Sequence, residues 1–337
     1  MANSPLVEVK NLSVRFPVYG GVLSRKVGEV RAVDDISFSI GRSEIVGLVG
    51  ESGCGKTTVG RAMINILKYI AADVEVEGQI QYNFDGSNVD FAKLHPRKMR
   101  EFRSRVQMIF QDPYASLNPR MTVSQIVEEP LKIHTELKGP QRREKVITLL
   151  EKVGLSEDQS GRFPHEFSGG QRQRVGIARA LAPSPDLIIC DEPVSALDVS
   201  IQAQVINLMV DLQKEFDVSF LFIAHDLSVV EHISDKIAVM YLGNMVEFGE
   251  SKQVYHHPRH PYSKALLSAV PLPDPKKKNR QRIVLKGDVP TPMNKPSGCS
   301  FRTRCPQAEP SCADHVPIFE THAPEHWVAC PIVKEHE

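Results

Sequence analysis

The stretch "GESGCGKT", residues 50 to 57, combines glycines with one lysine and one threonine at a spacing that suits phosphate chemistry. It fits the pattern G-x-x-x-x-G-K-[ST] and lies between an apolar run and a helix-forming segment, the context that this motif requires. Its glycines let the backbone wrap around a phosphate, and the following helix adds its positive end. We expect Lys56 to reach the β- and γ-phosphates of a nucleotide and the Thr57 hydroxyl to bind Mg²⁺. The residues predicted to hold the phosphates are Gly50, Glu51, Ser52, Gly53, Cys54, Gly55, Lys56, Thr57 and Thr58.

A pair of carboxylates ends a second apolar run, "LIICDEP". Asp191 closes the predicted strand, so its carboxylate lies at the edge of a sheet, where the Mg²⁺ of a nucleotide would bind. Glu192 follows directly and can accept a proton from an attacking water molecule. An acidic pair at a strand end is often only the start of a solvated loop. Together with a phosphate loop, it favours hydrolysis of a nucleotide.

A third motif, "FSGGQRQRVGIARAL", places two glycines at the start of a helix. Ser168 suits the N-cap position, and Gly169, Gly170 and Gln171 follow it. The glycines expose further backbone N–H groups at a second positive helix end. A plain capped helix is the alternative, but it leaves the paired glycines unexplained. One chain rarely needs two phosphate cradles for one nucleotide, so we predict a dimer in which this motif closes over ATP held by the partner.

The elements that position these motifs follow the order of an α/β protein. The first 45 residues alternate between apolar and polar side chains, which is typical of half-buried strands. The runs "IVGLVG", "DLIICDE" and "SFLFIAHD" are continuously apolar, as in strands buried on both faces. Residues 112 to about 168 form helices, with "QRREKVITLLEKVGL" as the clearest amphipathic segment. The segment "KIAVMYLGNMVEFGE" predicts a hairpin, and 13 of the 24 prolines lie after residue 250.

Composition excludes several classes of function. The 337 residues contain 41 Lys plus Arg and 41 Asp plus Glu, so no overall basic field favours nucleic acid. The longest apolar runs fall far short of the roughly 20 residues that a membrane span needs. The N-terminus lacks the basic start and apolar segment of a secretory signal. We therefore expect a soluble protein in the cytosol, where structural disulfides are rare.

Four of the six cysteines lie in the last 39 residues of the chain: Cys299, Cys305, Cys312 and Cys330. They are separated by five, six and seventeen residues. Structural zinc sites usually begin with a closer pair, and the common ferredoxin spacings also differ. Clustered cysteines in a cytosolic protein indicate a metal or redox role, but the spacing alone leaves the metal open.

The order of the motifs resembles that of the ATP-binding subunits of ABC transporters, over residues 5 to 250. The phosphate loop is followed by "FQDP", "SGGQ", "CDEP", "SALD" and "IAHD". The resemblance implies that Gln111 senses the γ-phosphate and Mg²⁺ and relays to membrane subunits. It implies that Asp198 acts across a dimer interface and that His225 contacts the γ-phosphate. Phe16 is the expected adenine contact, with Tyr19 as the alternative and a core role for Phe16 still open.

The same resemblance sets the expected fold and domains. It implies an α/β ABC-type ATPase whose mixed sheet carries an antiparallel β subdomain and a helical subdomain at about residues 112–180. The nucleotide-binding domain is expected over residues 1–250. Residues 251–337 are expected to form a small, irregular, metal-binding extension.

Two longer segments resemble the ATPase subunits of bacterial oligopeptide and dipeptide importers: "FQDPYASLNPRMTVSQIVEEPL" and "HHPRHPYSKALLSAVPLPDP". That resemblance implies a paralogous ATPase as dimer partner, two membrane permeases, an extracytoplasmic binding protein and a place on the cytoplasmic face of the cell membrane. Only 56 residues separate Gln111 from Ser168, which rules out the long coiled coils of DNA-repair relatives. Importers of oligosaccharides or nickel, and a soluble ABC ATPase without a transporter, are the alternatives.

The pattern "GCSFRTRCP…SC…HWVAC" resembles the C-terminal extension of peptide-importer ATPases, in which four cysteines hold a [4Fe–4S] cluster. The resemblance implies that Cys299, Cys305, Cys312 and Cys330 are its ligands, with zinc as the second possibility. Arg302 and Arg304 could offset the negative charge of such a cluster. Cys54 and Cys190 are excluded, since one lies in the phosphate loop and the other in a buried strand.

Overall fold

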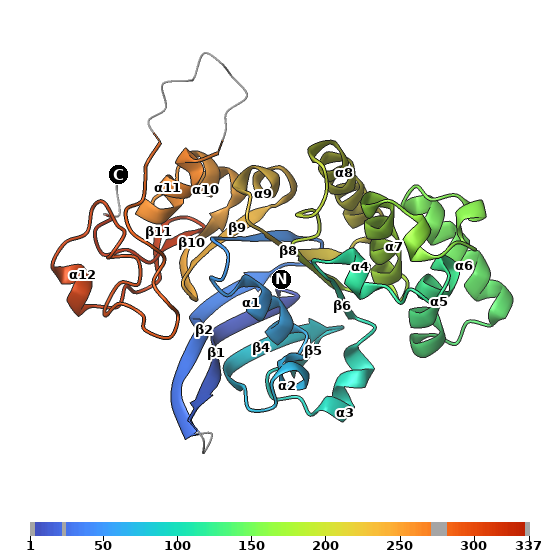
Figure 1. Ribbon diagram of the computed structural model, residues 1–337, viewed down its shortest axis with the longest axis horizontal. Helices are drawn as coiled ribbons and strands as arrows, with labels where there is room; N and C mark the ends of the chain where they lie inside the picture. Colours follow the sequence, from blue (N-terminus) through green and yellow to red (C-terminus); the bar gives the residue numbers. More distant parts are fainter. Residues whose placement is uncertain (1–3, 22–24, 271–281, 334–337) are drawn as a thin grey trace, which may run out of the picture. The chain divides into compact units, whose positions relative to one another are not determined.

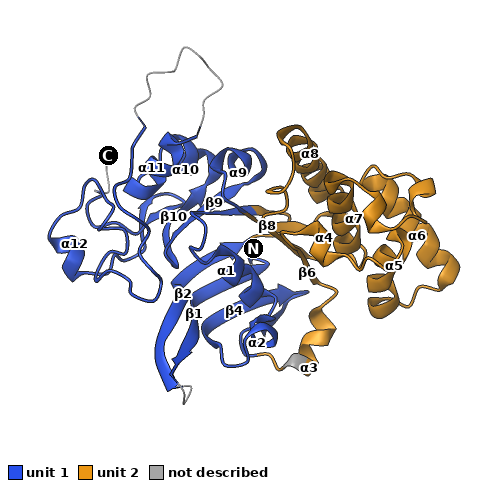
Figure 2. Ribbon diagram, viewed as in Figure 1, with its two compact units in different colours: residues 1–40, 46–93, 224–337 blue, residues 41–45, 94–223 orange. Residues whose placement is uncertain are grey.

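The computed structural model describes residues 4–21, 25–270 and 282–333. The chain forms two compact units (Figure 2). Unit 1 comprises residues 1–40, 46–93 and 224–337, and unit 2 comprises residues 41–45 and 94–223. The phosphate loop and the four clustered cysteines therefore belong to unit 1, whereas the acidic pair and the "SGGQ" motif belong to unit 2.

Unit 1 contains a four-stranded antiparallel sheet with the order β2-β1-β4-β5 (Figure 1). Its strands are β1 (Val7–Gly20), β2 (Arg25–Ile40), β4 (Glu75–Phe84) and β5 (Ser87–Asp90). Val7 pairs with Ile40 on one side and with Tyr82 on the other, and all three side chains are buried. The alternating pattern of the first 45 residues thus correctly predicted strands with one buried face.

A second set of strands in unit 1 is mixed. The fully buried strand β3 (Ile45–Val49) runs parallel to β9 (Lys236–Tyr241), and β9 runs antiparallel to β10 (Asn244–Glu250). The turn between β9 and β10 holds Leu242 and Gly243 at φ values of 46° and 83°, the left-handed pair that a two-residue hairpin favours. The predicted mixed sheet and the predicted hairpin are both confirmed.

The extension adds strands to the edge of this sheet. Strand β12 (His326–Val328) pairs antiparallel with β10, and β11 (Glu320–Ala323) pairs with β12. The carboxylate of Glu247 is fully buried and lies 2.7 Å from Nε2 of His326, which is also buried. The extension was expected to be irregular, but a paired and buried part of it continues the sheet. The helices of unit 1 are α1 (Lys56–Met63), α2 (Leu67–Ile70), α9 (Leu227–Ile233), α10 (Ser251–His256), α11 (Pro261–Ser268) and α12 (Ser311–Asp314).

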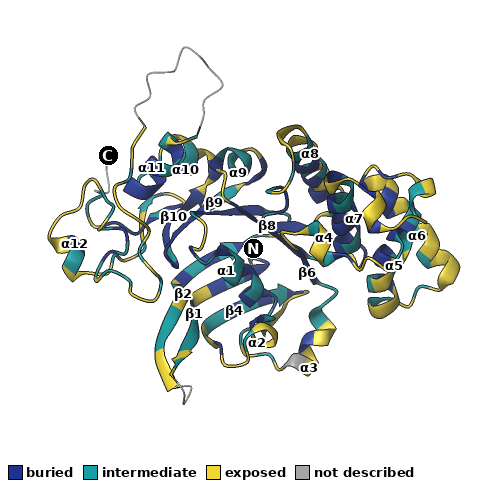
Figure 3. Ribbon diagram, viewed as in Figure 1, coloured by how far each residue is buried: buried dark blue, intermediate teal, exposed yellow. Residues whose placement is uncertain are grey.

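Among the described residues, unit 2 contains three parallel strands and six α-helices. Strands β6 (Val106–Ile109), β7 (Leu187–Asp191) and β8 (Ser219–Ala224) pair in the order β8-β7-β6. Every residue of β7 and β8 is buried, as their continuous apolar runs predicted (Figure 3). The α-helices are α3 (Pro96–Met99), α4 (Pro113–Ser116), α5 (Val123–His134), α6 (Gly139–Lys152), α7 (Gly169–Leu181) and α8 (Val199–Phe216), with short 3-10 turns at Arg100–Phe102, Glu157–Gln159 and Pro164–Glu166.

Helices α5, α6 and α8 of unit 2 bury one face each. In α6 the buried residues are Val146, Leu149 and Leu150, spaced as one face of a helix, which confirms the predicted amphipathic segment. Across the ranges that the structure describes, we find no helix long and apolar enough to cross a membrane.

Candidate functional site

The phosphate loop, residues 50–57, connects β3 to α1 and depends on glycine for its path. Gly50 and Gly55 have φ values of 156° and 106°. A Cβ atom at Gly50 would lie 2.2 Å from the carbonyl oxygen of Met240, and one at Gly55 would lie 2.1 Å from that of Ala32. No other residue fits these two positions, because backbone cannot yield as a flexible side chain can. The predicted glycine pattern therefore has a steric cause.

The side chain of Lys56 is buried and turns back into this loop. Its ammonium donates hydrogen bonds to the carbonyl oxygens of Gly50, at 2.8 Å, and of Glu51, at 3.1 Å. Its charge is thus held inside the cradle, at the first residue of α1, where the helix N-terminus also favours an anion. This arrangement suits the binding of a phosphate group.

Two residues from beyond position 250 form hydrogen bonds with Glu51. The backbone N–H of Glu51 donates to Oη of Tyr262 at 3.0 Å. The carboxylate accepts two hydrogen bonds from the guanidinium of Arg304, at 2.7 and 3.2 Å. The sequence assigned neither residue to the phosphate loop, because both lie more than 200 positions from Glu51. Arg304, which the sequence suggested as a counter-charge for a cluster, is paired with the loop instead.

The two cysteines that the sequence excluded from the cluster are both buried. Burial raises the pKa of the Cys54 thiol, although Lys56 opposes the shift. Burial also raises the pKa of Cys190, which lies in β7. Both thiols stay protonated at neutral pH and act as small apolar side chains.

The carboxylates of unit 2 lie where the sequence predicted them. Asp191 is the last residue of β7 and is 2% exposed. Glu192 follows with φ at 46°, a left-handed conformation that is costly outside glycine and concentrates at functional sites. Its backbone N–H donates to the carbonyl oxygen of Ile223 at 3.0 Å, which fixes the start of the loop.

Gln111 and Glu192 are in direct contact. The amide Nε2 of Gln111 donates to Oε2 of Glu192 at 3.0 Å, although 81 residues separate them in the sequence. The parallel strands β6 and β7 explain this contact, because they are neighbours and their carboxyl ends lie at the same edge. A predicted general base and a predicted sensor of the γ-phosphate therefore form one hydrogen-bonded pair.

The "SGGQ" motif caps α7 as predicted. Oγ of Ser168 accepts from the backbone N–H of Gln171, and the Gln171 side chain accepts from the N–H of Ser168 at 3.0 Å. Ser168 and Gly169 are exposed. Gly170 has a packing reason that the sequence did not reveal, since a Cβ there would lie 2.5 Å from Cγ2 of Ile201 in α8.

The remaining predicted residues lie at the ends of elements or on a strand. Asp198 precedes α8, is exposed, and its side chain makes no cap hydrogen bond. His225 follows β8 directly and is exposed. Phe16 lies on β1, paired with Val30 and partly exposed, while Tyr19 is 51% exposed. Nothing in this arrangement separates Phe16 from Tyr19 as the adenine contact.

The four clustered cysteines are brought into one neighbourhood. Cys299, Cys312 and Cys330 are buried and Cys305 is partly buried. The backbone N–H of Cys299 donates to the carbonyl oxygen of Cys312 at 2.8 Å. Burial, together with the smaller electrostatic influence of Cys330, Cys299 and Cys312, raises the pKa of the Cys305 thiol to about 11. The fold thus gathers thiols that are far apart in the sequence.

No metal centre follows from this geometry by itself. Within residues 4–21, 25–270 and 282–333, no group of three or more His, Cys, Asp or Glu side chains is arranged to hold a metal ion. The predicted metal-binding character of the extension is therefore not supported by the structure.

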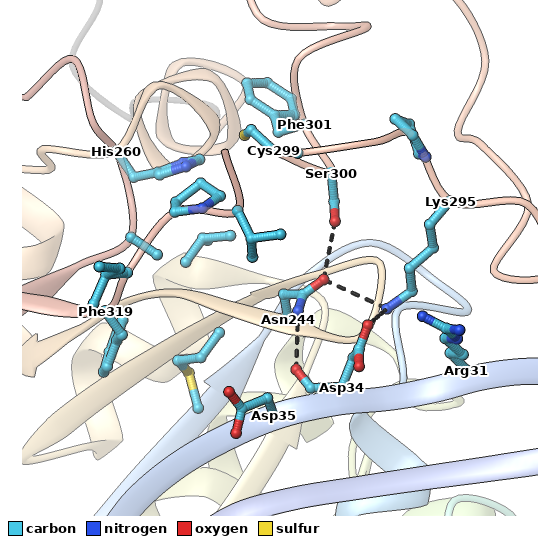
Figure 4. Close-up of a pocket in the computed structure, with 18 of the residues that line it drawn as sticks. Arg31, Asp34, Asp35, Asn244, His260, Lys295, Cys299, Ser300, Phe301 and Phe319 are labelled. Carbon is cyan, nitrogen blue, oxygen red and sulfur yellow. Dashed lines mark hydrogen bonds and ion pairs between the residues drawn. The ribbon is translucent and has the colours of Figure 1, made fainter. Parts of the chain in front are cut away.

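A cavity of about 760 Å³ lies beside the cysteine segment in unit 1 (Figure 4). Lys295 forms an ion pair of 2.9 Å with Asp34 across it, and Oδ1 of Asn244 accepts from Oγ of Ser300 at 3.0 Å. Burial lowers the pKa of Lys295, and the hydrogen bond with Asp34 opposes that shift only in part. These contacts anchor residues 295–300 to β2 and β10.

Comparison with known proteins agrees with these motifs. Residues 33–195 match the family model described as ABC transporter. Residues 246–312 match the one described as oligopeptide/dipeptide transporter, C-terminal region. The second match covers the phosphate-loop contact Arg304 and the first three of the four clustered cysteines.

Curated relatives extend the match over nearly the whole chain. The oligopeptide transport ATP-binding protein AppF of Bacillus subtilis is 53% identical over 327 residues, which cover 96% of each chain. The oligopeptide transport ATP-binding protein OppF of Haemophilus influenzae is 50% identical over 329 residues, again 96% of each chain. A dimeric ATP-binding cassette, solved in a post-hydrolysis state with ADP and Pi, is 26% identical with a TM-score of 0.60 and covers 73% of this chain and 98% of its own. The structure of cbiO1 from Clostridium perfringens, part of an ABC transporter complex, is 26% identical with a TM-score of 0.61. The match covers 75% of this chain and 91% of cbiO1.

The chain therefore belongs to the ABC transporter ATPases, and within them to the oligopeptide transport ATP-binding proteins.

Proposed function

We propose that this chain is the ATP-hydrolysing subunit of an importer for dipeptides and oligopeptides. The observation that carries the proposal is the pairing of Gln111 with Glu192, in a chain whose phosphate loop holds Lys56 inward. The substrate class rests on the relatives, which are oligopeptide transport ATP-binding proteins. This chain matches them over nearly their whole length. Residues that contact a peptide belong to other subunits, so this chain supplies the energy of transport and not its specificity.

The phosphate loop binds the triphosphate of ATP in this proposal. Backbone N–H groups of residues 50–58 surround the β-phosphate, and Lys56 forms charge-assisted hydrogen bonds to the β- and γ-phosphates. Mg²⁺ would be held by the Thr57 hydroxyl, Asp191 and Gln111, and it would neutralise charge that develops on the phosphates. The burial of Asp191 at the end of β7 fits a carboxylate that serves a cation.

Glu192 is the general base. It takes a proton from the water that attacks the γ-phosphorus, and Gln111 orients its carboxylate through the hydrogen bond of 3.0 Å. His225 contacts the γ-phosphate and Phe16 stacks on the adenine, with Tyr19 as the alternative contact. In this proposal Gln111 binds Mg²⁺ and also contacts the base Glu192. It can therefore sense whether the γ-phosphate is present.

ATP is hydrolysed in a dimer with a paralogous ATPase. Ser168 caps the N-terminus of α7, where Gly169 is also exposed, and the exposed carboxylate of Asp198 makes no cap hydrogen bond, so these residues are available to a second molecule. These residues close over the nucleotide bound by the partner. Two membrane permeases and an extracytoplasmic binding protein complete the complex, which places this chain on the cytoplasmic face of the membrane.

Peptide should stimulate ATP hydrolysis by the assembled complex. We expect the complex in lipid vesicles to hydrolyse ATP several-fold faster when its binding protein carries an oligopeptide than when it is empty. An oligosaccharide and Ni²⁺, offered in the same assay, serve as controls for the two other substrate classes. Stimulation by either of these and not by peptide would refute the proposed substrate.

We also propose that the extension holds a [4Fe–4S] cluster on Cys299, Cys305, Cys312 and Cys330. Support comes from the burial of these thiols, from the electrostatic influence of the other three on Cys305, and from the match to the oligopeptide transporter C-terminal region. A cluster would supply a covalent link between three segments of a part of the chain that has little apolar core. Zinc on the same thiols is the alternative.

Iron content tests the cluster directly. Protein purified without oxygen should be brown and contain about four irons per chain. The variant Cys312→Ala should lose most of that iron, whereas Cys190→Ala, which removes a buried thiol outside the extension, should keep it. A colourless protein with one tightly bound zinc would contradict the iron cluster and retain the four ligands.

A further inference from the structure

The cysteine-bearing extension makes direct contact with the phosphate loop. The guanidinium of Arg304 and the carboxylate of Glu51 form a two-point ion pair, with N–O distances of 2.7 and 3.2 Å. The Arg304 side chain is 9% exposed and that of Glu51 is 26% exposed. Paired bonds of this kind fix geometry as well as charge, because both planar groups are held in one orientation.

Arg304 is itself held in place by a buried aromatic cluster of Tyr241, Tyr262 and Phe301. The backbone N–H of Arg304 donates to the carbonyl oxygen of Phe301 at 3.0 Å, so the two residues belong to the same turn. Phe301 is 1% exposed and packs against both tyrosines, with ring centroids 5.1 and 5.3 Å apart. The guanidinium lies 5.9 Å from the centre of the Tyr241 ring. Burial of this cluster leaves Arg304 little freedom to move.

The backbone of Glu51 is held from the same side. Its N–H donates to Oη of Tyr262, a member of the aromatic cluster and the second residue of α11. Both the main chain and the side chain of one loop residue are therefore bound by residues of the extension. Lys56 donates to the carbonyl oxygen of that same residue, so Glu51 links the extension to the phosphate-binding lysine.

We propose that Arg304 is a positioning residue for ATP binding, through which the C-terminal extension controls the affinity of the phosphate loop. The carboxylate of Glu51 would lie next to a triphosphate and repel it if it were left unpaired. Arg304 cancels that charge and fixes the loop in the conformation that presents its N–H groups. The inference rests on the proposed binding of ATP at residues 50–58.

Removing the cation should weaken ATP binding. For Arg304→Met, which keeps the length of the buried stem, we expect the Kd of ATP·Mg²⁺ to rise about tenfold in calorimetric titration of the full chain. The matched control is Arg302→Met, because Arg302 lies in the same segment and its guanidinium donates hydrogen bonds to Ser297 and not to the phosphate loop. Its Kd should stay within twofold of the unsubstituted protein.

Two further variants separate positioning from a merely structural anchor. In the double variant Glu51→Gln with Arg304→Met, the repelling charge is gone, so ATP should bind more tightly than to Arg304→Met alone. Glu51→Asp shortens the carboxylate by one methylene and leaves the extension untouched. It should weaken ATP binding by a factor similar to that of Arg304→Met, which keeps the test valid even if the arginine variant unfolds.

The outcomes distinguish the inference from the function on which it rests. If the unsubstituted chain binds no ATP, the proposed nucleotide site is wrong. If it binds ATP and both Arg304→Met and Glu51→Asp stay within twofold of it, the contact only anchors the extension and our inference is overturned. The same holds if Arg304→Met lowers the Tm without changing the Kd, or if the double variant binds no better than Arg304→Met.

Discussion

Replacement of Glu192 by glutamine should reduce ATP hydrolysis by about 10²–10⁴-fold in the assembled complex, the usual contribution of a general base. The amide has the shape of the carboxylate but cannot take a proton from the attacking water. The hydrogen bond with Gln111 and the packing of β7 survive the change, so ATP should still bind and the closed dimer should accumulate. The measurement is the steady-state rate of phosphate release beside the Kd for ATP.

The control for this variant is Glu215→Gln, because Glu215 is an exposed carboxylate of the same unit whose ion pair with Lys152 lies on the surface. It should hydrolyse ATP at the normal rate, since exposed ion pairs contribute little to stability. If Glu192→Gln also retained a rate near that of the unsubstituted complex, Glu192 would not be the base.

Replacement of Ser168 by arginine should inactivate the site of the partner subunit while this chain binds ATP normally. A long cation fills the space in front of the exposed N-terminus of α7 and removes its cap hydrogen bond. Loss of preorganised donors at such a position typically reduces turnover at that site by about 10²–10³-fold. Single-turnover hydrolysis, counted per dimer, measures how many sites remain.

Combination with Lys56→Ala decides whether the motif acts across the dimer. If the motif acts across the dimer, the two substitutions disable different ATP sites. Each single variant then keeps one active site, and a chain that carries both substitutions keeps no active site. If Ser168 served its own nucleotide, the double variant would be no worse than either single one. Ser156→Arg is the matched control, because Ser156 begins another exposed Ser-x-x-Gln turn of unit 2, in which the Gln159 side chain accepts from the N–H of Ser156 at 3.0 Å. This variant should keep both sites.

Sequence alone predicted most of the candidate site, because its parts are short and local. The phosphate loop is eight consecutive residues whose glycines, lysine and threonine are each required by the backbone path or by the chemistry. The capping box of α7 spans four residues, and the fully apolar runs of β7 and β8 are typical of central strands wherever they occur. Local geometry and burial determine all of these features, and both leave direct patterns in sequence.

Some predictions failed or stayed open for the opposite reason. The sequence assigned Gly170 to a phosphate cradle and gave no sign of its close approach to Ile201 in the next helix, where a Cβ would lie 2.5 Å from Cγ2. The extension has many prolines and weak periodicity, and these hid its pairing of β12 with β10. Packing between distant segments decides such features, and no local pattern encodes it.

What the sequence by itself determined is the chemistry: a phosphate loop, an acidic pair at a strand end and a capped helix, in the order of one family. Only the tertiary structure decided which distant groups meet. Gln111 reaches Glu192 because β6 and β7 are neighbouring parallel strands. Arg304 reaches Glu51, 253 residues away, because a buried aromatic cluster holds the extension against the loop. Ion pairs between remote side chains depend on the path of the whole chain, whereas the pattern of the phosphate loop lies within eight consecutive residues.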